Sequence, residues 1–227
     1  MLNNTNPSLA EGEDFSTKST ANTGFNANPK SQLGRKLVQE LIDSGISVNW
    51  QGLLNYSNVN RAECFKLMGY KWTGWVVLYK DLDGNPYLHN GKPFYRFKPD
   101  AGQLKPNKDG KKPPKYLSLG NGGCRPYFSP FLKVQGLIDA LKKTGDVIFT
   151  EGEKKADSLV FHGFTAIGIA GVDCWRDGRS TEMLPELEAM NWRGRNAFIM
   201  FDSDVTTKDS VQRALKVFAC KLTAVSY

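Results

Sequence analysis

Histidine and cysteine are scarce in this sequence, and their scarcity limits the metal chemistry that it can support. The chain has two histidines and four cysteines, and no two cysteines form a C-x-x-C pair. A structural zinc site is therefore not expected. We predict that the four cysteines are reduced thiols of the core or the surface; they are Cys64, Cys124, Cys174 and Cys220.

Long hydrophobic runs are absent as well. No apolar run approaches the roughly 20 residues that a helix needs to cross a bilayer, and the polar N-terminus lacks the apolar centre of a signal peptide. These two absences predict a soluble, cytoplasmic protein with no membrane partner. The sequence also has no Gly-x-x-x-x-Gly-Lys-Ser/Thr phosphate loop, so nothing in it marks a helicase part.

Positive charge, in contrast, is present and unevenly placed. The chain carries a net charge of +7, and residues 92–133 hold ten Lys or Arg against two Asp, a local balance of +8. A basic band of this kind favours a polyanionic partner such as nucleic acid. The alternative interpretation is a solvated lysine-rich loop without a partner.

Composition divides the 227 residues into three parts. Residues 1–32 are rich in Asn, Ser, Thr, Gly and Pro and have few large apolar side chains, which predicts a disordered tail. Residues 33–144 are expected to form a helical and small antiparallel-sheet region that is basic. Residues 145–227 are expected to form an α/β domain, and 40% hydrophobic residues suffice for a real core.

The second part begins with two predicted helices. Apolar residues at helical spacing predict the first over residues 34–44, with Gly45 as its stop signal. Asn60 is a residue type preferred at a helix start, and Gly69 is one preferred just after a helix end. They predict the second helix over residues 60–68.

The period then changes to that of strands. Strands are predicted at residues 75–79, 94–97 and 116–119, and the turn-forming sequences Asp83-Gly84-Asn85-Pro86 and Asn90-Gly91 lie between the first two. Residues 99–114 are dominated by Lys, Pro, Gly and Asn, which predicts an exposed loop. The pattern therefore indicates a small antiparallel sheet with a basic loop.

Aromatic residues in this part permit two interpretations. They could form a surface on which single-stranded bases stack, or they could fill the core of the small sheet. The residues are Trp72, Trp75, Tyr79, Tyr87, Phe94, Tyr95, Phe97 and Tyr116.

Two acidic motifs follow short apolar runs in the third part. Glu151-Gly152-Glu153 comes after residues 147–149, and Asp202-Ser203-Asp204 comes after residues 197–201. Both runs are typical of buried strands of a parallel sheet, whose carboxyl ends meet at the edge where α/β proteins usually bind ligands. Carboxylates that converge there form a site for a hard divalent cation, Mg²⁺ or Mn²⁺.

The carboxylates have different predicted roles. Asp202 and Asp204 are two residues apart, so they can share one metal ion. Glu151 would approach from the neighbouring strand and either help to hold the metal or act as a general acid or base. Glu153 lies in a first helical turn, where it either favours the helix dipole or joins the metal site. Asp173 either reaches the same edge or is a plain loop residue.

The order of these motifs resembles the Toprim domain of bacterial-type primases, topoisomerases and certain nucleases. In that family a strand ends in Glu-Gly, a second strand ends near a Gly, and a third ends in Asp-x-Asp. The matching parts here are Glu151-Gly152, residues 168–171, and Asp202 with Asp204. The resemblance implies that Glu151, Asp202 and Asp204 are catalytic and that the matching Glu acts as an acid or base.

A Toprim-like subgroup from replication primases and primase-helicases of plasmids, phages and other mobile elements is more similar still. Its hallmarks are matched by Thr150-Glu151-Gly152-Glu153-Lys154-Lys155-Ala156, Gly171-Val172, Leu184-Pro185-Glu186-Leu187, Gly194-Arg195 and Phe201-Asp202-Ser203-Asp204. The basic part resembles that subgroup too, through Tyr95-Arg96-Phe97-Lys98-Pro99-Asp100 and Gly110-Lys111-Lys112-Pro113-Pro114-Lys115-Tyr116.

The chain departs from the subgroup at its C-terminal end. A fourth strand is expected at Leu222 to Tyr227, and members continue with an acidic Lys-Gly-x-Asp-Asp segment that completes the metal edge. The sequence given stops before it. Two interpretations are open: a C-terminally incomplete piece of a larger replication protein, or a short protein that binds rather than cuts or polymerises.

These observations predict a Mg²⁺-dependent nucleic-acid enzyme of the Toprim or primase type, acting in the DNA replication of a mobile element. The alternatives are a Toprim nuclease and a non-catalytic DNA-binding module. Expected partners are single-stranded or primer-template DNA, nucleoside triphosphates and a replicative helicase. The residues predicted to bind nucleic acid are Arg96, Lys98, Lys111, Lys112, Lys115, Lys154 and Lys155.

Overall fold

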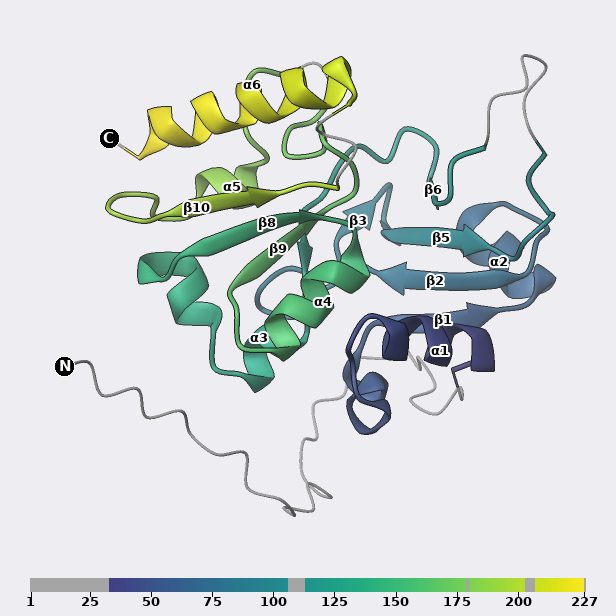
Figure 1. The fold of residues 1–227 in the computed structure, drawn as a ribbon. Coiled ribbons are helices and arrows are strands. Elements are labelled where there is room, and N and C mark those ends of the chain that lie inside the picture. Colours follow the sequence, from purple (N-terminus) through teal and green to yellow (C-terminus); the bar gives the residue numbers. More distant parts are fainter. Residues whose placement is uncertain (1–32, 106–112, 179, 203–206, 227) are drawn as a thin grey trace.

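A computed structural model describes residues 33–105, 113–178, 180–202 and 207–226 (Figure 1). Its helical elements are α1 (Arg35–Asp43), η1 (Val48–Leu53), α2 (Arg61–Met68), α3 (Phe131–Val134), η2 (Ala140–Thr144), α4 (Glu153–Phe161), α5 (Pro185–Glu188) and α6 (Asp209–Val225). Its strands are β1 (Tyr56–Val59), β2 (Gly74–Leu78), β3 (Leu88–His89), β4 (Lys92–Pro93), β5 (Tyr95–Pro99), β6 (Leu117–Ser118), β7 (Tyr127–Phe128), β8 (Val147–Glu151), β9 (Ala166–Ile169) and β10 (Ala197–Met200).

The predicted antiparallel sheet is confirmed. It has four strands in the order β1-β2-β5-β6, and every neighbouring pair runs antiparallel. The predicted Asn90-Gly91 turn joins β3 to β4, and both of its residues adopt positive φ angles, 50° and 73°. Asn and Gly tolerate that conformation better than other residues, which explains why the chain reverses there.

The second predicted helix has the expected ends. The Asn60 side chain accepts hydrogen bonds from the backbone N–H groups of Ala62 and Glu63, and the Glu63 carboxylate accepts one from the Asn60 N–H. This reciprocal arrangement satisfies donors that the first helical turn leaves free. Gly69 ends the helix with φ at +76°. The first predicted helix is also confirmed, as α1.

The other large sheet contains the three strands predicted in the α/β part. Its order is β10-β8-β9-β7, in which β8 pairs parallel with both β9 and β10. The fourth strand, β7, pairs antiparallel with β9 and comes from before residue 145, so the sheet draws on the segment that precedes the predicted α/β part. The chain is thus a mixed α/β protein with an antiparallel N-terminal region.

The two strands that follow β8 in the chain lie on opposite sides of it in the sheet. It first passes through α4, which packs on β8 and β9, and enters β9 on one side of β8. It then enters β10 on the other side of β8, and α6 follows along β10 (Figure 1). The strand order therefore reverses between β8 and β10, which is the point where open α/β sheets bind ligands.

The predicted strand at Leu222 to Tyr227 is wrong. Residues up to Val225 belong to α6, and Tyr227 lies outside the described residues. Leu222 is buried together with Val211, Ala214 and Phe218, so the apolar residues follow helical spacing. Packing of this stripe against the sheet outweighs the strand preference of the β-branched residues at the end.

The core is continuous between the two sheets. One hydrophobic cluster includes Leu37 and Tyr56 from the N-terminal region and Phe149 and Phe218 from the α/β part. Of the eight aromatic residues that were considered either as core or as a base-stacking surface, four are buried, namely Trp75, Tyr79, Phe94 and Phe97. The core interpretation therefore holds for those four. No helix in the described ranges has the length and apolar character needed to span a membrane.

Candidate functional site

A cavity of about 530 Å³ opens at the carboxyl ends of β8 and β10. Each side of it comes from a different part of the chain: β5, the segment before β6, the β8–α4 turn, and the residues after β9 and β10. Its lining residues are Arg96, Lys98, Pro114, Lys115, Tyr116, Glu151, Gly152, Glu153, Lys154, Lys155, Ala170 and Asp202.

Seven of the ten residues predicted from sequence as site residues line this one cavity. They are Arg96, Lys98, Lys115, Glu151, Lys154, Lys155 and Asp202. Asp204, Lys111 and Lys112 lie outside the described residues. The fold therefore brings the basic N-terminal region and the acidic strand ends to the same place.

The β8–α4 turn depends on two glycines. Gly152 has φ at +94° and directly precedes α4, as expected for a turn from strand into helix. Gly168 of β9 lies against this turn: a Cβ there would be 3.1 Å from the Gly152 carbonyl oxygen and 3.2 Å from the Ala156 Cβ. This close packing holds the start of α4 at the cavity floor.

Asp202 forms an ion pair with Lys155 across the two strand ends. The Lys155 Nζ donates to Asp202 Oδ1, and both side chains are half exposed. The ammonium group of Lys155 offsets the negative charge of Asp202 at this edge of the sheet. A divalent cation at Asp202 would compete with the Lys155 ammonium group for the same oxygen.

Glu40 of α1 is a site residue that the sequence analysis missed. Its Oε2 accepts hydrogen bonds from Lys98 Nζ at 2.6 Å and Lys154 Nζ at 2.5 Å. Burial acts to raise the pKa of the Glu40 carboxyl, but the two lysines outweigh it and leave that pKa lowered. No local sequence signal marks this contact, because Glu40 and Lys154 are 114 residues apart.

Glu153 lies in the predicted first helical turn, where an acid favours the helix dipole, and its carboxylate is also buried and paired. Its side chain is 1% exposed, and its Oε1 accepts a hydrogen bond from Tyr79 Oη at 2.6 Å and one from Arg96 Nη1 at 2.7 Å. A buried carboxylate needs such partners, since an unpaired charge in the interior is costly. Burial acts to lower the pKa of Arg96, but Tyr79 and Glu153 outweigh it and raise that pKa.

A second buried carboxylate lies on α4 one turn further on. Asp157 is fully buried, and it accepts hydrogen bonds from Tyr56 Oη at 2.8 Å and from Tyr127 Oη at 3.0 Å. Burial raises the pKa of Asp157 to about 7, against the opposing effect of hydrogen bonds from Ser129 and the two tyrosines. Tyr56 belongs to β1 and Tyr127 to β7, so Asp157 ties both sheets to α4.

Asp173, a weaker candidate, and Arg195 of the Gly194-Arg195 hallmark are engaged elsewhere. Asp173 pairs with Arg176 at 2.9 Å and is not a lining residue of the cavity. Arg195 donates to the carbonyl oxygens of Gly145, Asn191 and Ala140, so it stabilises the loop before β8. These contacts favour the interpretation of Asp173 as a loop residue and give Arg195 a structural role.

The donor set of the cavity suits a hard cation in part. Glu151 and Asp202 offer carboxylate oxygens, and Mg²⁺ in proteins commonly takes one or two carboxylates and completes its shell with water and substrate phosphate. Among the described residues no group of three or more His, Cys, Asp or Glu could hold a metal ion. The pair therefore fits a cation that is bound together with a phosphate ligand.

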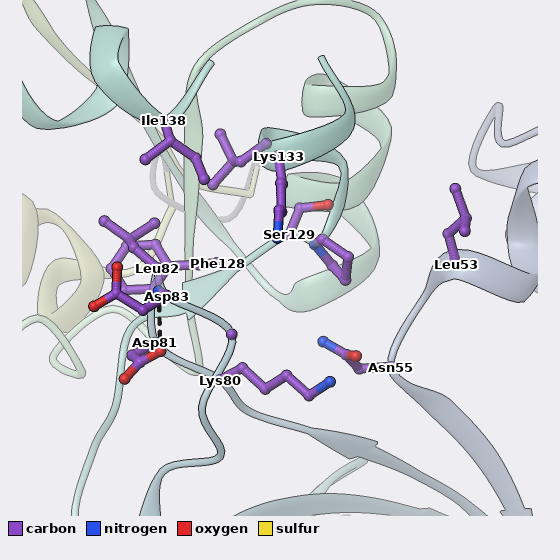
Figure 2. A pocket seen from close by; sticks show the side chains of 13 residues that line it. Leu53, Asn55, Lys80, Asp81, Leu82, Asp83, Phe128, Ser129, Lys133 and Ile138 are labelled. Atoms are coloured by element: carbon purple, nitrogen blue, oxygen red, sulfur yellow. Dashed lines mark hydrogen bonds between the residues drawn. The ribbon is translucent and has the colours of Figure 1, made fainter. Parts of the chain in front are cut away.

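A smaller cavity of about 210 Å³ lies on another part of the molecule (Figure 2). Lys80, Asp81 and Asp83 line it beside the apolar side chains of Leu82 and Phe128. Asp81 Oδ1 is already committed, because it accepts hydrogen bonds from the backbone N–H groups that follow in its turn. None of the predicted site residues lines this cavity.

Two of the four cysteines meet, although they are 50 residues apart in sequence. The Cys174 thiol hydrogen-bonds to Cys124 and thereby lowers the pKa of Cys124, against opposing effects of burial and of Asp177. The same hydrogen bond, with burial, raises the pKa of Cys174. Burial raises the pKa of Cys64, which is fully enclosed.

We expect iodoacetamide near neutral pH to modify Cys124 several-fold faster than Cys64 and Cys174, because the thiolate is the reactive form. Peptide mapping by mass spectrometry over a time course measures the three rates. In the Cys174→Ala variant the reaction of Cys124 should slow, since its thiolate loses a donor. Equal rates for Cys124 and Cys64 in the folded protein would contradict this expectation.

The fold and cavity define a mixed α/β protein whose candidate site lies at a sheet edge and combines carboxylates with lysine and arginine. Residues 140–226 match the family model described as "Domain of unknown function (DUF3854)". No curated protein and no solved structure matches the chain. The matched segment contains β8, α4, β9, β10 and α6, and thus the acidic half of the cavity.

Proposed function

We propose that this protein is a Mg²⁺-dependent nucleic-acid enzyme of the Toprim or primase type that acts in the DNA replication of a mobile element. The observation that carries the proposal is the cavity at the strand-order reversal between β8 and β10, where Glu151 and Asp202 lie among basic side chains. This is the place and the chemistry that phosphoryl transfer on a polyanion requires.

The charges of the cavity support a phosphate-bearing ligand. Five basic residues line it together with three acidic ones; the basic residues are Arg96, Lys98, Lys115, Lys154 and Lys155. Tyr116 lies among them, with the Arg96 Cζ at 4.7 Å from its ring centroid. Cations positioned near a strand end neutralise phosphate oxygens, and an aromatic ring beside them offers a surface for a base or sugar.

Three residues of the cavity would have distinct roles in this reaction. Glu151 and Asp202 would hold a Mg²⁺ ion, which supplies charge stabilisation to the reacting phosphate. Lys155, displaced from Asp202, would pair with a phosphate oxygen. Glu151 is also placed to accept or return a proton from an attacking or leaving oxygen at the end of β8.

A binding module is the second candidate. Its supporting observation is that Asp202 is paired with Lys155, which is an arrangement that is complete without metal. In that case the basic wall would hold single-stranded DNA and the carboxylates would be structural.

An activity assay tests the proposal. Labelled single-stranded DNA is incubated with Mg²⁺ or Mn²⁺, with and without nucleoside triphosphates, and the wild type is compared with Asp202→Asn plus Asp204→Asn. Triphosphate-dependent products that the variant lacks indicate a primase, and shortened strands that it lacks indicate a nuclease. Equal DNA binding by both proteins with no turnover would refute the enzyme and favour the binding module.

A further inference from the structure

The wall of the cavity contains a buried ion pair that joins the antiparallel sheet to helix α4. Arg96 comes from β5 and Glu153 from the first turn of α4, and both residues line the cavity. The two side chains are 10% and 1% exposed, so the pair is nearly removed from bulk water. A charge pair in such a position is costly to form and is weak evidence for stabilisation by itself.

The contacts around Arg96 fix its orientation from two directions. Nη1 donates to Glu153 Oε1 at 2.7 Å, and the guanidinium carbon lies 4.7 Å from the Tyr116 ring centroid. Tyr79 Oη donates to the same Glu153 oxygen at 2.6 Å and holds the carboxylate in place. A guanidinium held at one nitrogen and over one ring has a defined plane.

The pair leaves hydrogen-bonding capacity unused. Among the described residues neither Nε of Arg96 nor Oε2 of Glu153 has a hydrogen-bond partner, although both atoms are buried. Arg96 lines the cavity and keeps 10% of its side chain exposed, so its guanidinium group can still meet a ligand there, whereas the enclosed Glu153 oxygen is an acceptor and cannot bind a phosphate. The planar fork of arginine suits the oxygens of a phosphate in particular.

We propose that Glu153 is a positioning residue that holds the Arg96 guanidinium at the cavity wall, where Arg96 contacts a phosphate group of the nucleic-acid substrate. This inference rests on the proposed function, because it assigns the phosphate to that substrate. It differs from a metal or helix-cap role, since Glu153 acts only through Arg96.

A positioning role and a purely electrostatic role for Glu153 predict opposite changes in DNA affinity when its charge is removed. If Glu153 were only a negative charge near the cavity, neutralising it would tighten the binding of a polyanion. If it positions Arg96, then Glu153→Ala should weaken binding, whereas Glu153→Gln should retain it because the amide oxygen still accepts from Arg96. The sign of the change therefore separates the two roles.

The experiment measures binding of a fluorescently labelled single-stranded thymidine oligonucleotide by anisotropy at fixed salt without metal. Arg96→Gln and Glu153→Ala should each weaken binding about tenfold, the double variant Arg96→Gln plus Glu153→Ala should be no weaker than Arg96→Gln alone, and Glu153→Gln should stay within about twofold of wild type. Lys221→Ala is the matched control, since Lys221 of α6 pairs with Glu182 and does not line the cavity.

Further readouts keep the test decisive. If Glu153→Ala does not fold, as judged by circular dichroism, the double variant Arg96→Gln plus Glu153→Gln replaces it and should bind as weakly as Arg96→Gln. Suppose that the wild type binds DNA. Tighter binding by Glu153→Gln, or unchanged binding by Arg96→Gln, would then overturn this inference but leave the proposed function standing. Absence of DNA binding by the wild type overturns the proposed function and this inference together.

Discussion

Asp202→Asn should weaken Mn²⁺ binding at the cavity and lower any metal-dependent turnover by about 10³-fold. The substitution exchanges an anionic oxygen donor for a neutral amide and leaves Glu151 as the remaining described carboxylate of the proposed metal pair. Charge stabilisation by a bound metal contributes several kcal/mol to phosphoryl transfer, and about 1.4 kcal/mol corresponds to a factor of ten in rate. Isothermal titration with Mn²⁺ measures the first effect, and the DNA assay measures the second.

Lys155→Met should change the affinity for Mn²⁺ in the opposite direction to Asp202→Asn. In the folded protein the Lys155 ammonium group occupies Asp202, so a metal ion must displace it. Its removal should therefore strengthen Mn²⁺ binding in the absence of DNA, by a modest factor because both side chains are half exposed and screened by solvent. Asp139→Asn is the matched control for Asp202→Asn, since Asp139 also forms an ion pair with a lysine, Lys143, but lies away from the cavity. If Asp202→Asn bound Mn²⁺ like the wild type, the metal assignment would be wrong.

Local signals in the sequence were sufficient for most of the elements that carry the site. The strands β8 and β10 follow from short apolar runs bounded by turn residues, because buried parallel strands have that composition. The strand β9 was expected from the family resemblance. The helix from Arg61 to Met68 follows from Asn60 and Gly69, because their preferences concern only the neighbouring backbone. Each of these features is decided within a few residues.

Long-range contacts could not be predicted in the same way. Glu153 looks like any acid in a first helical turn, yet its partners Tyr79 and Arg96 are 74 and 57 residues away. Glu40 carries no motif, yet it binds two lysines of the cavity. Such contacts depend on how the antiparallel sheet is placed against α4, and neither periodicity nor composition encodes that placement.

The error at the C-terminal end has a related cause. The fourth strand from Leu222 onward was expected from the family resemblance, and the β-branched residues Thr223 and Val225 are compatible with a strand. The buried positions Val211, Ala214, Phe218 and Leu222 instead share one face of α6, and Phe218 contacts Phe149 of β8 with ring centroids 4.8 Å apart. The helical spacing of these four residues becomes visible only over a window longer than the run from Leu222 to Tyr227.

Asp157→Asn should remove a pH dependence of stability that the wild type shows between about pH 4 and pH 7. Burial raises the pKa of Asp157 from 3.8 to about 7 in the folded protein. The folded state therefore binds more protons than the unfolded state in this window, and the free energy of unfolding falls as the pH rises. The full loss is about 4 kcal/mol, since each pKa unit corresponds to about 1.4 kcal/mol.

The amide that replaces the Asp157 carboxyl in this variant keeps an oxygen that accepts from Tyr56 and Tyr127 but has no charge to bury. Urea unfolding at a series of pH values gives the free energy of unfolding of both proteins, and the difference between them isolates this residue from other titrating groups. That difference should shift in favour of Asp157→Asn as the pH rises and level off above about pH 8. Because Glu153 on the same helix also raises the pKa of Asp157, Glu153→Gln should lower the upper end of the window. A difference that stays constant from pH 4 to pH 8 would mean that Asp157 is already ionised throughout, held by Tyr56, Tyr127 and Ser129 strongly enough to offset its burial.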